Sequence, residues 1–163
     1  MRIKIWTGIL AALAAAGLAA LLPGPAWAAS GTQPASGTFR DTSITLDTSR
    51  VADGNTIDVV TVSGFTTGTF DATFTETDQA VLHPDGSVTV TGQGVISGTL
   101  GSCGTGSAAY QLEAQGTPSD RSGFLQSIDQ AASTVTPSPV HSVVSFTANG
   151  ANEGTYTGTY HCT

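Results

Sequence analysis

The chain has 163 residues, of which 12 are acidic and 5 are basic, and its formal net charge at neutral pH is −7. A chain with this charge repels polyanions, so the composition argues against nucleic acid and anionic membrane surfaces as partners. Charged residues make up only 10% of the chain. Thr, Ser and Gly supply most of the polarity instead, which is typical of exported β proteins rather than of disordered segments.

Residues 1–28 predict a secretory signal peptide. Arg2 and Lys4 give a positive start, residues 5–22 give an apolar stretch, and Ala26-Trp27-Ala28 fits the small-x-small cleavage rule. A transmembrane anchor is the alternative, because the apolar stretch approaches the length that spans a bilayer. The Pro-Gly-Pro break before the cleavage site favours cleavage. The sequence therefore predicts a secreted, extracellular protein that has no membrane contact after cleavage.

Cleavage after Ala28 would leave a chain about the size of one small domain. Residues 29–36 are small and polar and predict a flexible leader, and residues 37–163 predict a β-barrel domain. The exported chain would keep three arginines, no lysine and all 12 acidic residues, for a net charge of −9. The absence of lysine, with abundant Ala, Gly and Thr, suggests a bacterial source with a GC-rich genome.

From Gly37 onward apolar and polar residues alternate, which is the pattern of β-strands. The pattern predicts strands at residues 37–46, 57–62, 68–78, 87–91, 95–100, 108–114, 140–148 and 154–162. Asp53-Gly54-Asn55, residues 83–87 and Asn149-Gly150 are predicted turns. Gly92 and Gly94 predict a bend or bulge. About eight strands at this spacing predict an all-β, antiparallel eight-stranded barrel, with a β-sandwich as the alternative.

Residues 119–133 differ from this pattern. Phe124, Ile128 and Ala132 are spaced four residues apart, and Leu125 is adjacent to the first of them. This spacing predicts one short amphipathic helix, and a loop that covers the barrel is the alternative.

Cys103 and Cys162 are the two cysteines of the chain. An even pair in an exported protein predicts one disulfide bond, because two thiols without neighbouring ligand residues make a poor metal site. The bond would close a loop of about sixty residues and stabilise the fold by roughly 4 kcal/mol in the chain-entropy model.

Motifs for catalysis and cofactors are missing from the sequence. There is no Gly-x-Ser-x-Gly elbow, and none of His83, His141 and His161 has a neighbouring Ser or Asp at an informative spacing. Residues 104–109 match G-x-G-x-x-A, but a predicted strand follows instead of a helix. The sequence therefore assigns no catalytic residue, no metal ligand and no cofactor.

The carboxylates offer one candidate site residue. Alternation places Asp71 and Glu113 on the outer face of the sheet. Glu76 and Asp78 share the inward parity of Phe70, but they fall near the predicted end of their strand, so they are expected to be solvated rim residues. If one carboxylate enters the barrel mouth, the sequence favours Glu76.

Four features carry a family resemblance: Gly37-Thr38-Phe39, the strand at residues 95–100, a strand that carries Tyr110, and the terminal Gly-Thr-Tyr strand. In this order they resemble the allene oxide cyclase-like barrel group, which includes dirigent proteins and bacterial families of unknown function. The resemblance covers roughly residues 36–162. It implies an eight-stranded barrel with an apolar interior, which in the plant members holds a small hydrophobic molecule. No catalytic residue of that group maps onto this chain, and the disulfide pair and the Thr-rich strands depart from the plant enzymes.

Six aromatic side chains are predicted to line the barrel interior: Phe70, Phe74, Tyr110, Phe146, Tyr156 and Tyr160. The leading hypothesis is a pocket that binds a small apolar ligand, and the competing interpretation is a filled core in a narrow barrel. A second hypothesis is cyclase-like or isomerase-like chemistry in the same cavity, which requires a buried ionisable group with a shifted pKa. A third is a structural cell-surface or adhesin-type domain, which a β-sandwich topology would favour. No feature of the sequence assigns an oligomeric state.

Overall fold

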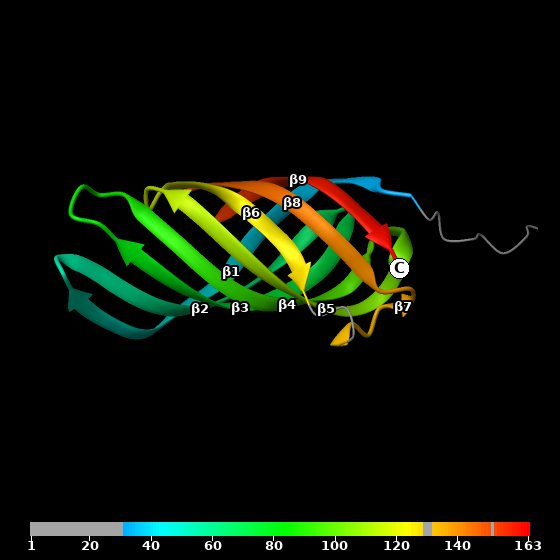
Figure 1. The fold of residues 1–163 in the computed structure, drawn as a ribbon, viewed down its shortest axis with the longest axis horizontal. Helices are drawn as coiled ribbons and strands as arrows, with labels where there is room; N and C mark the ends of the chain where they lie inside the picture. The colour runs from blue at the N-terminus through cyan, green and yellow to red at the C-terminus, as the bar shows by residue number, and fades with distance from the viewer. Residues whose placement is uncertain (1–30, 129–131, 151) are drawn as a thin grey trace, which may run out of the picture.

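A computed structural model describes residues 31–128, 132–150 and 152–163, so the expected signal peptide lies outside the described residues. The described chain is built almost entirely from antiparallel strands (Figure 1). The strands are β1 (Gln33–Ala52), β2 (Asn55–Gly68), β3 (Phe70–Leu82), β4 (Val88–Leu100), β5 (Gly104–Gly116), β6 (Asp120–Ile128), β7 (Thr136–Pro137), β8 (Val140–Asn149) and β9 (Glu153–Cys162). A 3-10 turn, η1 (Gly101–Cys103), joins β4 to β5.

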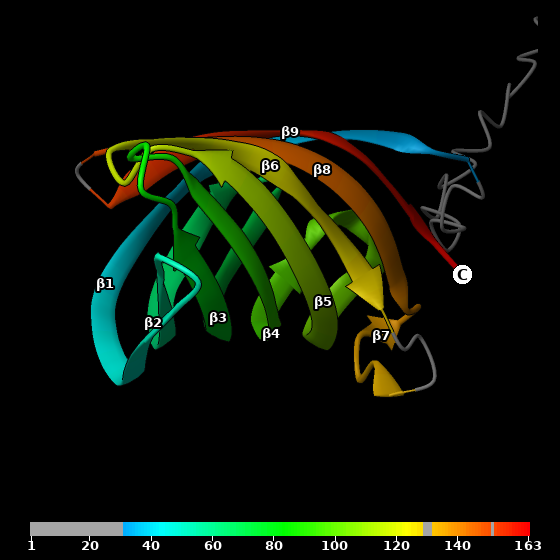
Figure 2. The same ribbon diagram turned by 60° about the vertical axis from the view of Figure 1, so that its left-hand side comes forward.

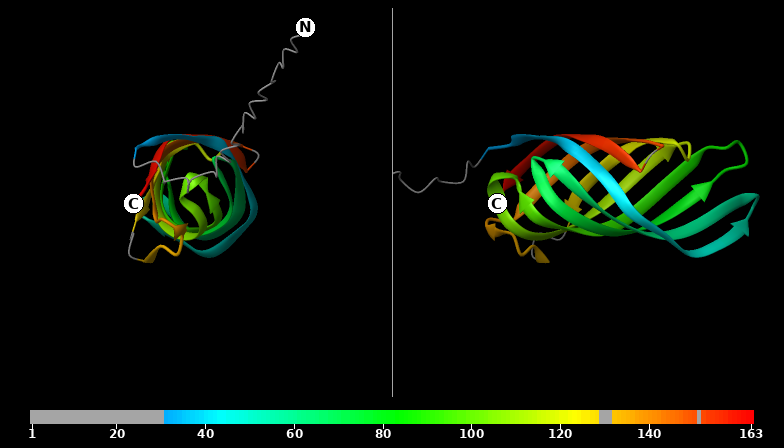
Figure 3. Two further views of the ribbon diagram at one scale, coloured as in Figure 1. Left: turned by 90° about the vertical axis from the view of Figure 1, so that its right-hand side faces the viewer. Right: turned by 180° about the vertical axis from the view of Figure 1, so that it is seen from behind.

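Eight of these strands close into a barrel. The sheet order is β4-β3-β2-β1-β9-β8-β6-β5, and a further pairing between β4 and β5 joins its two ends. The view along the barrel shows the closed ring (Figure 3). The short β7 adds to the side of β5, where Pro137 pairs with Gly104. The predicted eight-stranded antiparallel barrel is confirmed, and the β-sandwich alternative is wrong because the sheet closes on itself.

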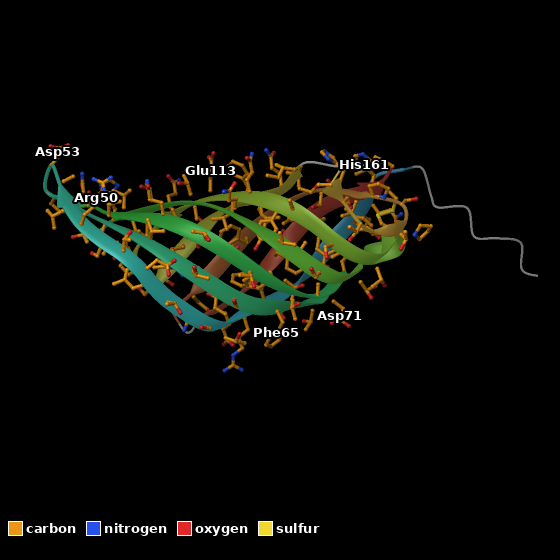
Figure 4. All side chains as sticks on the ribbon, turned by 90° about the horizontal axis from the view of Figure 1, so that it is seen from below. Arg50, Asp53, Phe65, Asp71, Glu113 and His161 are labelled. Atoms are coloured by element: carbon orange, nitrogen blue, oxygen red, sulfur yellow. A yellow bond between two sulfur atoms is a disulfide. The ribbon has the colours of Figure 1, made fainter. Side chains whose placement is uncertain are left out.

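Alternation along each strand sets the two faces of the barrel wall. Phe70, Ala72 and Phe74 on β3 are buried, whereas the intervening Asp71 and Thr73 are exposed. Asp71 and Glu113 point away from the barrel in Figure 4, as predicted. Successive side chains of a strand point to opposite faces, so alternate positions of the barrel strands turn toward the interior.

The two ends of the barrel differ. At one end, which we call the disulfide end, η1 and the last residues of β9 are joined by the Cys103–Cys162 bond. At the other, which we call the long-hairpin end, the β1–β2 and β3–β4 hairpins extend past the remaining strands (Figures 1 and 2). The pairing of β1 with β9 stops at Arg40, so the rest of β1 pairs only with β2. Its inward-facing Leu46 is consequently 58% exposed.

The predicted helix near residues 119–133 is wrong. Residues 120–128 form β6, which pairs with β5 on one side and β8 on the other. Residues four apart lie on the same face of a strand as well as of a helix, so the spacing of Phe124 and Ile128 is compatible with both structures. Residues 129–131 lie outside the described part of the chain.

Several predicted boundaries also need correction. β1 begins at Gln33, so residues 33–36 belong to the barrel and not to a flexible leader. The two strands predicted at residues 87–91 and 95–100 are one continuous strand, β4, whose pairing with β3 and β5 runs through Gly92 and Gly94 without a bulge. The register shifts lie in β1 instead, between residues 41 and 43 and between residues 46 and 48. No helix in the described residues is long and apolar enough to cross a membrane.

Candidate functional site

A cavity of about 100 Å³ lies inside the barrel. The buried side chains form two clusters, one toward the disulfide end around Leu100 and Tyr160 and one around Val62 and Val90, and the cavity wall takes residues from both. The side chains that line it are mainly apolar: Phe39, Phe70, Phe74, Ile96, Leu100, Ala108, Tyr110, Leu112, Leu125, Val140, Val144, Phe146 and Tyr156, with Thr66, Glu76, Ser127 and Ser142 as polar members. A void of about 150 Å³ holds a molecule the size of benzene, so this one suits a small apolar group.

Of the six aromatic side chains predicted to line the interior, five line the cavity. Tyr160 lies at its disulfide end, which we call the floor of the barrel. Phe70, Phe74, Tyr110, Phe146 and Tyr156 line the cavity. Tyr160 is buried but does not line it, and packs against the edge of Phe70 with ring centroids 5.7 Å apart. The Tyr160 hydroxyl donates to Gln33 and accepts from the backbone N–H of Ser102 at 3.1 Å. Tyr160 therefore closes the barrel at the disulfide end.

The disulfide stabilises this floor. Cys103 and Cys162 are bonded, as predicted, and their Cα atoms are 5.2 Å apart. Cys103 is fully buried in the same cluster as Leu100 and Tyr160. The bond joins the β4–β5 connection to the last strand, which holds the aromatic floor in place.

Glu76 contributes a carboxyl group to the cavity wall. It lies on the inner face of β3, and the Tyr110 hydroxyl on β5 donates a hydrogen bond to its Oε2. Burial raises the pKa of the Glu76 carboxyl from 4.5 to about 8, and the neighbouring charge of Asp78 adds to the rise. Burial, followed by the charge of Glu76, also raises the pKa of Tyr110. Tyr110 therefore stays a hydrogen-bond donor, and Glu76 exchanges a proton near neutral pH.

Gly94 on β4 makes this contact sterically possible. Gly94 lies between Glu76 and Tyr110 in the sheet register. A Cβ at this position would lie 2.7 Å from the Cβ of Glu76 and 2.8 Å from the Cζ of Tyr110, closer than real Cβ atoms approach other atoms. Two large polar side chains on β3 and β5 can therefore meet across β4 because β4 carries no side chain between them.

Asp78 lies one inward position further along β3 and is only 8% exposed. The expectation of a solvated rim residue is wrong for Asp78, because β3 continues to Leu82 and the wall of the barrel surrounds it. Its Oδ1 occupies the space that a side chain at Gly92 would fill, and this oxygen has no hydrogen-bond partner. Burial, followed by the charge of Asp41, raises the pKa of Asp78 to about 6.

Two further charged residues reach this region from other strands. Asp41 on β1 has a raised pKa, chiefly through burial, while the positive charge of Arg121 on β6 opposes the rise. The charge of Arg121 also lowers the pKa values of Glu76 and Asp78. Sequence reasoning missed both residues, since they come together with β3 only through closure of the barrel. Arg121 was counted among the three arginines that follow the predicted signal peptide, but nothing in the sequence assigned it to this site.

The three histidines do not contribute to this site. His83 hydrogen-bonds Asn55 Oδ1 at the base of the β3–β4 turn. His141 and His161 are neighbours on β8 and β9, with ring centroids 4.9 Å apart, and their positions alternate with inward-facing residues. Among the residues that the structure describes, no group of three or more His, Cys, Asp or Glu side chains is placed to hold a metal ion.

The fold and the cavity together define a small closed β-barrel that has an apolar interior and a polar group in its wall. No family model matches the chain, and no curated protein matches it either.

Proposed function

We propose that the protein is exported and binds a small apolar ligand inside its barrel. The observation that carries the proposal is the void of about 100 Å³ among Phe74, Leu112 and Phe146, since close-packed cores contain few voids larger than a water molecule. An apolar void binds small apolar molecules because filling it restores dispersion contacts that its lining lacks. The resemblance to the allene oxide cyclase-like barrels supports the same proposal.

A titration with toluene tests this function. Ala108 lines the cavity and is buried, so Ala108→Leu would place three more carbon atoms in the void. We expect toluene to bind the native protein and to bind Ala108→Leu at least about tenfold more weakly, a loss of about 1.4 kcal/mol. The matched control is Val95→Leu on the exposed outer face of β4. Equal binding to all three proteins, or binding to none, would contradict the proposal.

The export part of the proposal has its own test. The protein recovered from the culture medium or the periplasm of a bacterial host should begin at Ala29, as read by N-terminal sequencing. A recovered chain that still begins at Met1 would show that the leader is not cleaved. The disulfide supports export, because such bonds persist in oxidising compartments.

A second candidate function is isomerase-like chemistry in the same cavity. Glu76 favours it, because it is a carboxyl group in an apolar cavity with a pKa of about 8, within reach of a hydrogen-bonding tyrosine. A carboxylate of this kind can remove a proton next to a ketone and return it at the far end of a neighbouring double bond, so that the double bond becomes conjugated.

Cyclohex-3-enone is a suitable probe, since its six-membered ring is small and its conjugated isomer absorbs strongly in the ultraviolet. The candidate function predicts conversion by the native protein above the buffer rate and loss of this conversion in Glu76→Gln. Conversion at the same rate by both proteins, or no conversion above buffer, would remove isomerisation of this kind from consideration.

A further inference from the structure

The inner wall on the long-hairpin side of the cavity carries an unusual group of charges. Asp41 on β1 pairs with Gly64, and Gly64 pairs with Phe74, the inward position before Glu76 on β3. The charge of Asp41 raises the pKa values of Glu76 and Asp78, and we call these three residues the carboxyl cluster. Among the described residues, Arg121 on β6 is the one cation whose charge affects their pKa values. Burial raises the pKa of each of the three carboxyl groups, and the charge of Arg121 opposes the rise at all three.

Asp78 provides an independent sign that a donor is missing. The residue is only 8% exposed, yet its Oδ1 accepts no hydrogen bond. Buried polar atoms in proteins are almost always paired, because an unpaired one costs about 1–3 kcal/mol. The oxygen lies over Gly92 on the inner face of β4, so no side chain of that strand separates it from the lumen.

Glu76 belongs both to the carboxyl cluster and to the wall of the apolar cavity. Glu76 lines the cavity and lies two residues before Asp78 on the same face of β3. A molecule in the cavity can therefore present a polar head to Glu76, next to Asp78, while its apolar part contacts side chains such as Phe74 and Leu112. The site has the arrangement of an amphipathic pocket, in which the apolar wall binds and a few polar groups orient the ligand.

We propose that the preferred ligand of the cavity is a small aliphatic amine, whose hydrocarbon part fills the void and whose ammonium group donates to Glu76 and Asp78. This inference rests on the proposed function and adds the chemical class of the head group. An ammonium carries three donors and a positive charge, which match several acceptors of negative charge. A carboxylate head would be repelled by the same cluster, and a hydroxyl head supplies one donor and no charge.

The same geometry couples binding of the amine to the release of protons. Glu76 is faced by Tyr110 from β5, Asp78 from its own strand, Asp41 from β1 and Arg121 from β6. On the neighbouring inner positions β4 presents Gly92 and Gly94, and β2 presents Val60, Val62 and, further out, Asp58, whose carboxylate accepts from Ser49. A bound cation favours the ionised carboxyl groups, so binding should release protons and strengthen as the pH rises toward the pKa of the amine, about 10.

The test compares three probes that share a six-carbon chain and differ in the head: hexylamine, 1-hexanol and hexanoate. Calorimetric titration at about pH 8.5 should show hexylamine binding at least about tenfold more tightly than 1-hexanol, with hexanoate weakest. At about pH 6, where Glu76 is protonated, the preference for the amine should shrink several-fold. Ethylamine, which lacks the apolar chain, controls for attraction to the acidic surface.

Two variants locate the head group. Glu76→Gln and Asp78→Asn should each reduce the preference for hexylamine over 1-hexanol about tenfold while 1-hexanol binding persists. The matched control is Glu113→Gln, which removes one charge from the exposed outer face of β5 and should leave the preference unchanged (Figure 4). Thermal melting of each variant verifies that it is folded.

The outcomes separate this inference from the proposed function. If 1-hexanol and hexylamine bind equally and the two inner variants change nothing, the amine inference is wrong and the apolar pocket stands. If Glu113→Gln lowers amine binding as much as the inner variants do, the attraction is a surface effect and the inference is wrong. If neither the probes nor toluene bind, both proposals fail.

Discussion

Glu76 shows how one side chain joins the stability of this barrel to its proposed chemistry. Its carboxyl group lies in a wall made largely of apolar side chains, and Tyr110 donates to it from β5. Burial disfavours the charged form, so the folded protein binds the Glu76 proton more tightly than the unfolded chain does. The same property that makes Glu76 a proton donor or acceptor near neutral pH makes the fold sensitive to pH.

This linkage gives a prediction with a definite sign. The folded-state pKa of Glu76, about 8, lies above the ordinary value of 4.5, so its contribution to stability is fully present below the ordinary value and is lost as the pH rises through about 8. The free energy of unfolding should fall with rising pH across this range, with a slope of at most about 1.4 kcal/mol per pH unit from this group. Chemical denaturation at a series of pH values measures it.

Glu76→Gln tests the assignment of this slope. Glutamine keeps an acceptor for the Tyr110 hydroxyl and has no titrating proton. The variant should show a clearly flatter pH dependence, with a residual fall below about pH 6 that Asp78 supplies. Glu113→Gln, on the outer face, should keep the native slope. A native slope in Glu76→Gln would show that the buried carboxyl group is not its source.

For single residues, the sequence predicted the face of the strand on which a side chain lies better than it predicted whether that side chain is buried. Alternation placed Phe70, Phe74 and Tyr110 inward, and each is buried. It also gave Glu76 and Asp78 the inward parity, but the strand was expected to end at residue 78, whereas β3 runs to Leu82. The burial of both carboxyl groups depends on strands that lie far away in the sequence, and local patterns do not report those strands.

β4 is the element whose sequence matters most for the site. Its inner face carries Gly92 and Gly94 where a barrel strand would ordinarily carry large side chains. The sequence predicted a bend or bulge at these glycines. In the structure, the missing side chains leave room for Asp78 and for the contact between Glu76 and Tyr110. Local glycine patterns indicate that space is needed, but only the neighbouring strands show what fills it.

Gly94→Ala should therefore damage the site and the fold together. The added methyl group would overlap Glu76 and Tyr110, and overpacking of this kind typically costs about 1–3 kcal/mol. We expect a lower melting temperature and displaced Tyr110 ring resonances in NMR spectra. Gln93→Ala, at the adjacent exposed position, is the matched control and should leave those resonances in place. If Gly94→Ala is as stable as the control, the close packing described here is wrong.

For β6 the predicted type of element was wrong: the sequence pattern predicted a helix, and the structure has a strand. Phe124 lies on its outer face and is 42% exposed, whereas Leu125 and Ser127 line the cavity. A bulky residue on the outside next to one on the inside breaks the clean alternation of an amphipathic strand. The pairing of β6 with β5 and β8 overrides this weak local signal.

The whole molecule depends on contacts between distant parts of the chain. Closure joins β1 to β9 and β4 to β5, and the Cys103–Cys162 bond spans 59 residues at the floor of the barrel. Strand count and cysteine count were enough to predict a barrel and a disulfide. Contacts between side chains across the lumen determine the cavity, its volume and the carboxyl cluster. Local sequence patterns do not predict these contacts.

Reduction of the disulfide should lower the free energy of unfolding by about 2–4 kcal/mol, because the unfolded chain regains the freedom of a long loop. Denaturation with and without reductant measures this difference. The double variant Cys103→Ala with Cys162→Ala is the control, since reductant should not change its stability. A native protein that is equally stable in both conditions would show that the floor of the barrel does not need this bond.

An apolar molecule should bind inside the barrel, and intermolecular nuclear Overhauser effects with bound toluene measure this binding directly. We expect contacts from the toluene protons to side chains of the cavity wall, such as Phe74, Leu112 and Val144. Contacts only to apolar side chains of the outer face, such as Val95 and Phe124, or no contact at saturating toluene, would show that the interior does not bind it.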